Sequence, residues 1–298
     1  MNNSTDILAS IENEFTNVAN IRKSMMVAKK VQLHSGIEGF NSPDAYAIYR
    51  NTGGNALGVV GGVFEPMNLN LFLDTIIKSV EESSVNIDLS KLTYNEYKEG
   101  AKVVFRLPLK QYEIKTKMVG DVIETALEFR TGFDGKTKVS LGHSSYRIFC
   151  ANGAGNWKND VELSFKNTLN NQSKLCLFTS EIMTAIHDVD ANVAMLNKAV
   201  KVPVLKQAEI DTFLTKLTGY DVAQYKDLTT RKRNILDSIN ASIAIEMANT
   251  GHNMFSLLQG VTRYTTHDLA GSEMESILYS NVATINKRAH ELVNAVLN

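Results

Sequence analysis

The chain has 298 residues, of which 44% are hydrophobic and 21% are charged, so it has enough apolar material for a sizeable core. Its 31 basic and 32 acidic side chains leave a formal net charge of -1, which excludes a global basic field and requires any nucleic-acid surface to be local. Only two cysteines are present, Cys150 and Cys176, which excludes a disulfide scaffold; their apolar neighbours predict two buried thiols in a reducing compartment.

The first residues show no targeting signal. The segment 1–6 lacks the charged start and apolar stretch of a signal peptide. No apolar run in the chain approaches the ~20 residues that a membrane span needs. We therefore expect a cytoplasmic protein with no membrane partner, in the host cytoplasm if the protein is viral.

The first half of the chain changes from helical to strand periodicity. Apolar residues recur at helical spacing over residues 5–33. Residues 45–49 and 57–60 then read as strands, and the Gly/Asn-rich segment between them predicts a hairpin turn. Residues 68–83 return to helix, with Asn68 as the N-cap. Further strands are predicted at residues 103–107, 112–118, 122–129, 138–141 and 146–149, with a turn at 132–135.

The second half is predicted to be helical. A long helix is expected over residues 160–199, with a break allowed at 166–174, followed by helices near 207–217, 221–226, 229–249, 253–266 and 274–297. The predicted fold class is α+β, an antiparallel sheet meander flanked by helices, with a helical C-terminal third. The expected regions are an N-terminal helix at 1–40, an antiparallel sheet core at 41–160 and a helical region packed on that core at 161–298.

Basic residues are concentrated in the predicted sheet. Residues 101–150 carry nine basic and five acidic side chains, a local balance of +4. Lys115 and Lys117 would share one strand face. Such a strip, with Phe105, Tyr112 and Tyr146 nearby, suits a phosphate backbone and stacked bases, but the solvated outer face of a half-buried sheet shows the same pattern. The side chains assigned to a nucleic-acid surface are Lys102, Arg106, Lys115, Lys117, Arg130, Lys136, Lys138, Arg147, Trp157 and Lys158.

Arg147 precedes a Gly/Asn-rich turn at residues 151–156. Backbone N–H groups of such a turn bind anions, and Lys158 lies just beyond it, so this is a candidate phosphate site. It is not a P-loop, because the Gly-Lys-Ser/Thr ending is missing. An ordinary turn with a buried arginine paired to an acid is the alternative.

The sequence offers no recognisable catalytic constellation. His187, Asp188 and Asp190 come closest to a metal cluster, but their spacing fits a polar patch on a helix surface. No nucleophile elbow, catalytic carboxylate pair or dinucleotide-binding glycine motif is present. The sequence therefore predicts a protein that is not an enzyme and uses no cofactor or metal, while a metal- or nucleotide-dependent enzyme stays an open alternative.

Four sequence segments, in order over residues 45–297, carry a resemblance to a known family. They are Tyr46–Arg50 with Leu57–Met67, Gly120-Asp121 with Phe133–Gly135, Tyr146–Asn152, and Gly251–His267. On these segments the chain resembles the phage/plasmid-like protein family, which has no settled activity, and the stretch from Tyr279 to Leu292 also resembles the family's last helix. The departures are Arg263 in place of the family's glutamate, Phe255 in place of tryptophan, and Gly153 and Ala154 in place of threonine and leucine.

This resemblance implies a role in phage or plasmid DNA metabolism. The order of helix, antiparallel sheet and helix also resembles the layout of Rad52-like single-strand annealing proteins, an analogy that does not establish function. We therefore expect a single-stranded DNA-binding protein of recombination or replication, with strand annealing as its specialised form, acting as a homo-oligomer. The alternative is a non-enzymatic structural or host-interaction protein of a phage, which the near-zero net charge favours.

Overall fold

The computed structural model describes residues 17–38, 41–83, 85–117, 121–147, 152–154, 163–268 and 281–298. The chain divides into two compact units built from interleaved segments. The first unit comprises residues 1–109, 126–142 and 159–186, and the second comprises residues 110–125, 143–158 and 187–298. These units differ from the three consecutive regions expected from the sequence, because three strands and one helix each contribute residues to both.

The first unit begins with a small three-stranded sheet. Residues 17–24 are helical, and strands β1 (Ala28–Gln32), β2 (Ala45–Arg50) and β3 (Gly58–Gly61) follow, all paired antiparallel. The predicted hairpin between β2 and β3 is confirmed. The predicted helix up to residue 33 is wrong at its end, because residues 28–32 pair in register with β2 instead.

Helix α2 (Leu69–Glu82) confirms the predicted helix at residues 68–83. Asn68 is its N-cap, and the Asn68 side chain accepts hydrogen bonds from the backbone N–H groups of Asn70 and Leu71. These bonds satisfy two of the donors that a helix start leaves unpaired. The apolar face of α2 includes Phe72, Leu73 and Ile76, none of which is exposed.

The larger sheet has the strand order β4-β5-β6-β7-β8, and β9 pairs with β7. Its strands are β4 (Thr93–Tyr97), β5 (Lys102–Glu113), β6 (Val122–Gly132), β7 (Val139–Arg147), β8 (Asn152–Ala154) and β9 (Ser164–Phe165). Strands β5 and β7 are each continuous where the sequence predicted two shorter strands. Strand β5 continues through Pro108 because Pro108 lies beyond the residues paired with β4, where a missing N–H group costs no bond to that strand.

Aromatic rings fill the core of the first unit. Phe72 of α2 meets Phe105 of β5 edge to face, with ring centroids 5.6 Å apart. Phe178, at the start of helix α3 (Leu177–Lys201), lies 5.6 Å from Phe72 and 5.7 Å from Phe129 of β6. All four rings are fully buried, and they join the two helices to one face of the sheet.

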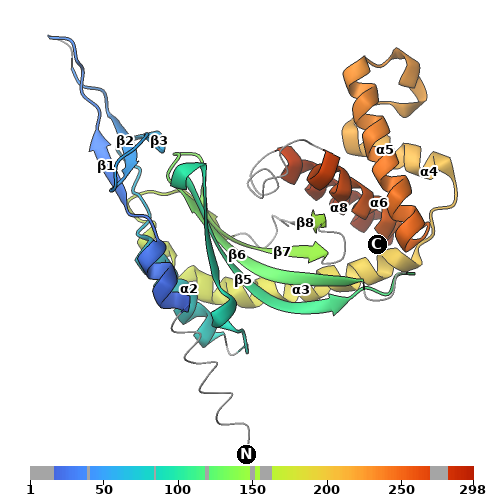
Figure 1. Ribbon diagram of the computed structural model, residues 1–298, viewed down its shortest axis with the longest axis horizontal. Helices are drawn as coiled ribbons and strands as arrows, with labels where there is room; N and C mark the ends of the chain where they lie inside the picture. Colours follow the sequence, from blue (N-terminus) through green and yellow to red (C-terminus); the bar gives the residue numbers. More distant parts are fainter. Residues whose placement is uncertain are drawn as a thin grey trace, which may run out of the picture. The chain divides into compact units, whose positions relative to one another are not determined.

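The second unit is mainly helical (Figure 1). Besides the rest of α3, it contains α4 (Gln207–Thr218), α5 (Thr230–Thr250), α6 (Met254–Arg263) and α8 (Asn281–Leu297), with the short 3-10 helix η5 (Val222–Asp227) and the π-helix η6 (Tyr264–Asp268). The predicted helices from residue 207 onward are confirmed within the described residues. The predicted helix over 160–199 is wrong in its first part, where β9 and the turn η4 (Gln172–Lys174) precede α3.

Helices α5 and α6 pack closely and form the core of the second unit. A Cβ atom at Gly260 would lie 2.5 Å from the Cα atom of Ile243, so only glycine permits this approach. Glu246 of α5 is fully buried, and its Oε1 atom lies 4.0 Å from Nη1 of Arg263. Strand β8 contacts α6 and η6. Asn152 of β8 ends one of the segments on which the family resemblance rests, and α6 and η6 contain most of another, Gly251–His267.

The α+β class predicted from the sequence is confirmed, with two antiparallel sheets and helices in the C-terminal third. Within the described part of the chain, no helix combines the length and the apolar character needed to cross a membrane.

Candidate nucleic-acid interface

A surface pocket of about 580 Å³ in the first unit gathers three lysines. Lys98 comes from the turn η2 (Lys98–Gly100), Lys102 from the start of β5, and Lys136 from the turn between β6 and β7. Leu57 and Ala101 are buried beneath it, and Glu99 and Asp134 are its acidic residues. We call this site the basic pocket.

The turn that carries Lys98 is strained. Lys98 and Glu99 have φ angles of 51° and 58°, the only positive values at non-glycine residues in the described chain, and Gly100 has φ of 99°. Left-handed backbone at a residue with a Cβ atom costs about 1–3 kcal/mol, so the surrounding structure must hold the turn. Lys98 in this turn and Lys102 just after it, four positions apart in the sequence, line the same pocket.

Arg50 holds this turn from the neighbouring small sheet. Its Nη1 atom donates a hydrogen bond to the carbonyl oxygen of Glu99 at 3.0 Å and forms an ion pair with Glu96. Tyr94 in turn donates to Glu96 Oε1 at 2.6 Å. Burial, together with the bond to Glu96, raises the pKa of the Tyr94 hydroxyl above its usual range, so Tyr94 stays a neutral donor. Arg50, Glu96 and Tyr94 therefore form a chain of three interacting side chains that holds the turn beside the basic pocket.

The carboxylate of Asp134, which lines the basic pocket, is hydrogen-bonded within its own turn between β6 and β7. Its Oδ1 atom accepts hydrogen bonds from the backbone N–H groups of Lys136 and Thr137 at 2.9 and 2.7 Å, and its Oδ2 atom accepts one from the Thr137 hydroxyl. These bonds orient the carboxylate toward its own turn. The lining of the basic pocket therefore carries three lysines and two acidic residues, one of which is bonded to its own turn, and this composition suits an anion such as a phosphate.

The structure brings together two of the residues predicted for a nucleic-acid surface, Lys102 and Lys136. Lys98 was missed because the sequence around it gives no sign of a left-handed turn. Arg106 is half-buried on β5, on the same side of the strand as Lys102 by alternation. Lys138 is exposed next to β7 and does not line the pocket.

Other predicted contacts belong to the second unit or fall outside the described residues. Lys115 and Lys117 are exposed, but they lie in the connection after β5, so the expectation of a shared strand face is wrong. Arg147 is the last residue of β7 and pairs with Asn152 of β8. Trp157, Lys158 and residues 151, 155 and 156 of the turn proposed to bind an anion lie outside the described residues, while residues 152–154 of that turn form strand β8.

Two of the aromatic residues expected to stack on bases have other roles. Phe105 is fully buried in the core of the first unit, so it is not accessible to a base. The hydroxyl of Tyr112 donates to Asp190, whose carboxylate also lies 3.6 Å from Lys110. Burial is the main cause that raises the pKa of Tyr112, followed by its bond to Asp190.

The assignment of Arg130 to the nucleic-acid surface is wrong. Its side chain is only 6% exposed, and its Nη2 atom lies 2.7 Å from Oε2 of Glu128, which is 1% exposed. A guanidinium buried in this way neutralises an interior carboxylate and is not accessible to a phosphate.

Replacing Arg130 with methionine is expected to lower the free energy of unfolding by about 3–5 kcal/mol, because Glu128 would lose its buried ion-pair partner. Urea unfolding followed by circular dichroism measures the change. Arg231→Met, at an exposed position in the first turn of α5, is the control and should change stability by less than about 0.5 kcal/mol. Equal effects of the two substitutions would contradict a buried ion pair at Arg130.

Other candidate sites from the sequence stay without support. The described residues contain no group of three or more His, Cys, Asp or Glu side chains placed to hold a metal ion. His187 is an exposed residue of α3. Cys176 is exposed, so the expectation of two buried thiols is wrong at that position, and Cys150 lies outside the described residues.

The fold and the site define an α+β protein with a lysine-lined surface pocket next to a strained turn. No family model, curated protein or solved structure matches this chain. The resemblance to the phage/plasmid-like protein family and to Rad52-like proteins therefore stays a prediction.

Proposed function

We propose that this protein binds single-stranded DNA of a phage or plasmid during recombination or replication, with strand annealing as the specialised form of that activity. The observation that carries the proposal is the basic pocket, where Lys98, Lys102 and Lys136 surround one surface hollow. A backbone phosphate would accept hydrogen bonds from these ammonium groups. These phosphate contacts are independent of base sequence and do not themselves involve the bases.

The charge distribution of the chain supports local binding. The whole chain has a net charge of -1, so attraction to DNA depends on where the lysines gather. No cofactor is needed for phosphate contacts of this kind. We further propose that the protein acts as a homo-oligomer, since annealing requires two strands to be held by linked sites.

Salt dependence is the direct test of the proposal. Fluorescence anisotropy of a labelled single-stranded oligonucleotide, titrated with protein at several salt concentrations, should show affinity falling as salt rises. Three phosphate contacts predict a slope of log affinity against log salt of about -2 for a single strand. Binding that is absent at low salt, or that does not respond to salt, would contradict the proposal.

A protein-interaction role is the second candidate. Several valines around the small sheet are exposed, among them Val59 at 61% and Val63 at 70%. Light scattering with and without oligonucleotide separates the two candidates. An assembly that forms or rearranges on DNA favours the first, and an unchanged mass favours the second.

A further inference from the structure

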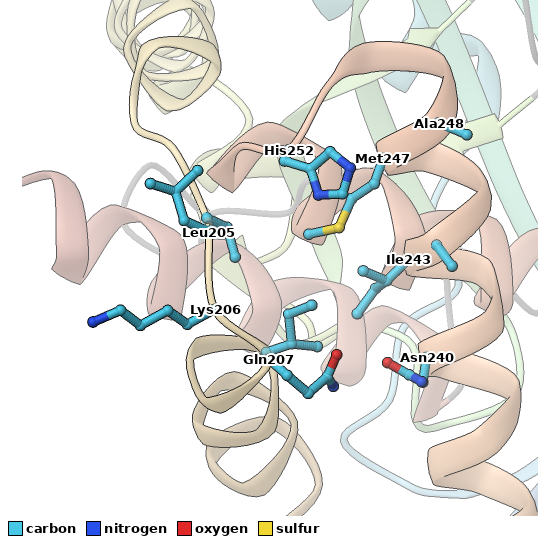
Figure 2. Close-up of a pocket in the computed structure, with 11 residues that line it drawn as sticks. Leu205, Lys206, Gln207, Asn240, Ile243, Met247, Ala248 and His252 are labelled. Atoms are coloured by element: carbon cyan, nitrogen blue, oxygen red, sulfur yellow. The ribbon is translucent and has the colours of Figure 1, made fainter.

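A second pocket, of about 360 Å³, lies in the second unit between the first turn of α4 and the exposed side of α5 (Figure 2). Its apolar wall includes Ile243 and Met247, which are 1% and 5% exposed. Its polar lining includes Gln207, Asn240 and His252. An apolar wall with a few polar groups is the usual composition of a site for a small organic group.

The side chains in this pocket indicate an uncharged ligand. Figure 2 shows the amide groups of Gln207 and Asn240 turned toward each other, and the His252 ring and the Met247 side chain both line the pocket. The Lys206 side chain points away from the pocket, although its residue contributes to the lining. With no cation directed inward, an isolated phosphate or carboxylate has no charged partner here.

Hydrogen bonding further narrows the class of ligand. The Nε2 atom of Gln207 donates to Asp211 Oδ1 at 2.9 Å, which fixes the orientation of the amide and leaves Gln207 Oε1 as an acceptor. The Asn240 amide supplies both a donor and an acceptor. Adjacent donors and acceptors are what the edge of a nucleobase requires, and a flat ring also fits against a thioether and an imidazole.

We propose that this pocket, on α4 and α5, receives an unstacked nucleobase. The inference rests on the proposed binding of single-stranded DNA and assigns base contacts to the second unit. Met247 and His252 would contact the faces of the base, and Gln207 and Asn240 would bond to its edge. Stacking on side chains tolerates all bases, so the preference among bases comes from the two amides.

The test compares two oligonucleotides of equal length and equal charge, one normal and one abasic at every position. The protein is expected to bind the normal strand more tightly. Ala244→Trp, at an exposed residue that lines the pocket, should fill it and weaken binding to the normal strand roughly tenfold, while leaving binding to the abasic strand unchanged. Ala241→Trp, on the same helix but outside the pocket lining, is the matched control and should have no effect.

A second measurement does not depend on the phosphate contacts. Free nucleosides titrated into the protein should shift the NMR signals of the His252 ring, and Asn240→Ala should reduce the shift. No shift, or an equal effect of Ala244→Trp and Ala241→Trp on the normal strand, would overturn the nucleobase proposal. If the protein binds both strands equally and with strong salt dependence, the proposed DNA binding stands and the nucleobase pocket fails. If nucleosides bind but neither oligonucleotide does, the proposed DNA binding fails and the pocket still binds a nucleobase.

Discussion

Replacing Lys98, Lys102 and Lys136 together with glutamate is expected to weaken binding of single-stranded DNA roughly 1,000-fold at low salt. Each lost hydrogen bond to a charged group is worth about 1.5 kcal/mol, and 1.4 kcal/mol is a tenfold change in affinity. The introduced carboxylates would also repel the phosphates. The salt dependence of the remaining binding should become shallower by about 2 in the log–log slope, because three phosphate contacts are lost.

A matched variant separates the basic pocket from the general charge of the first unit. Lys23, Lys78 and Lys91 are exposed residues of the same unit that do not line the pocket, and their replacement by glutamate changes the net charge equally. This control should retain most of the affinity. Anisotropy titrations in which both triple variants lose the same affinity would mean that DNA responds to overall charge. No loss in the pocket variant would remove the basis of the proposed function.

Gly260→Ala is expected to destabilise the second unit by about 2 kcal/mol. The added methyl group would lie 2.5 Å from Cα and Cγ1 and 2.8 Å from the backbone nitrogen of Ile243. Overpacking of this kind costs about 1–3 kcal/mol and occasionally more when backbone has to shift, while alanine regains about 1 kcal/mol of helix propensity. Two of the three close atoms belong to the backbone, so helices α5 and α6 would have to separate.

Thermal and urea unfolding of the Gly260→Ala variant measure this effect. Gly36→Ala, at an exposed glycine with no atom within 4 Å of the added methyl group, should leave stability within about 0.5 kcal/mol of the parent protein. Shortening Ile243 to alanine in the Gly260→Ala background should restore little, because that change removes only the Cγ1 contact. Full recovery would show that the side chain, and not the backbone, sets the distance between the two helices.

Local sequence patterns correctly predicted the elements that depend on neighbouring residues, such as helix caps, turns and amphipathic helices. The amide of Asn68 caps α2 as expected, and the Gly/Asn-rich segment after β2 forms the hairpin turn. Helices α4, α5 and α6 follow their apolar periodicity. Predictions failed where pairing with a distant strand outweighed local preference, as in residues 28–32, which follow a helical pattern but pair with β2.

The candidate site was only partly predictable for the same reason. The basic composition of residues 101–150 pointed to Lys102 and Lys136, but charge counts do not separate a surface lysine from a buried arginine. Arg130 can be buried because it forms an ion pair with Glu128, which is also buried in the first unit. The burial of both residues depends on the tertiary packing around strand β6.

Periodicity, turn chemistry and composition were enough to predict the α+β class, most helices of the second half and the region in which lysines gather. The fold of the chain, and not any local pattern, brings Lys98 to the same pocket as Lys102 and Lys136. That arrangement depends on a left-handed turn held by Arg50, a residue nearly fifty positions away in the chain. Gln207 and Asn240 likewise face each other because helix packing, and not sequence spacing, brings α4 and α5 together.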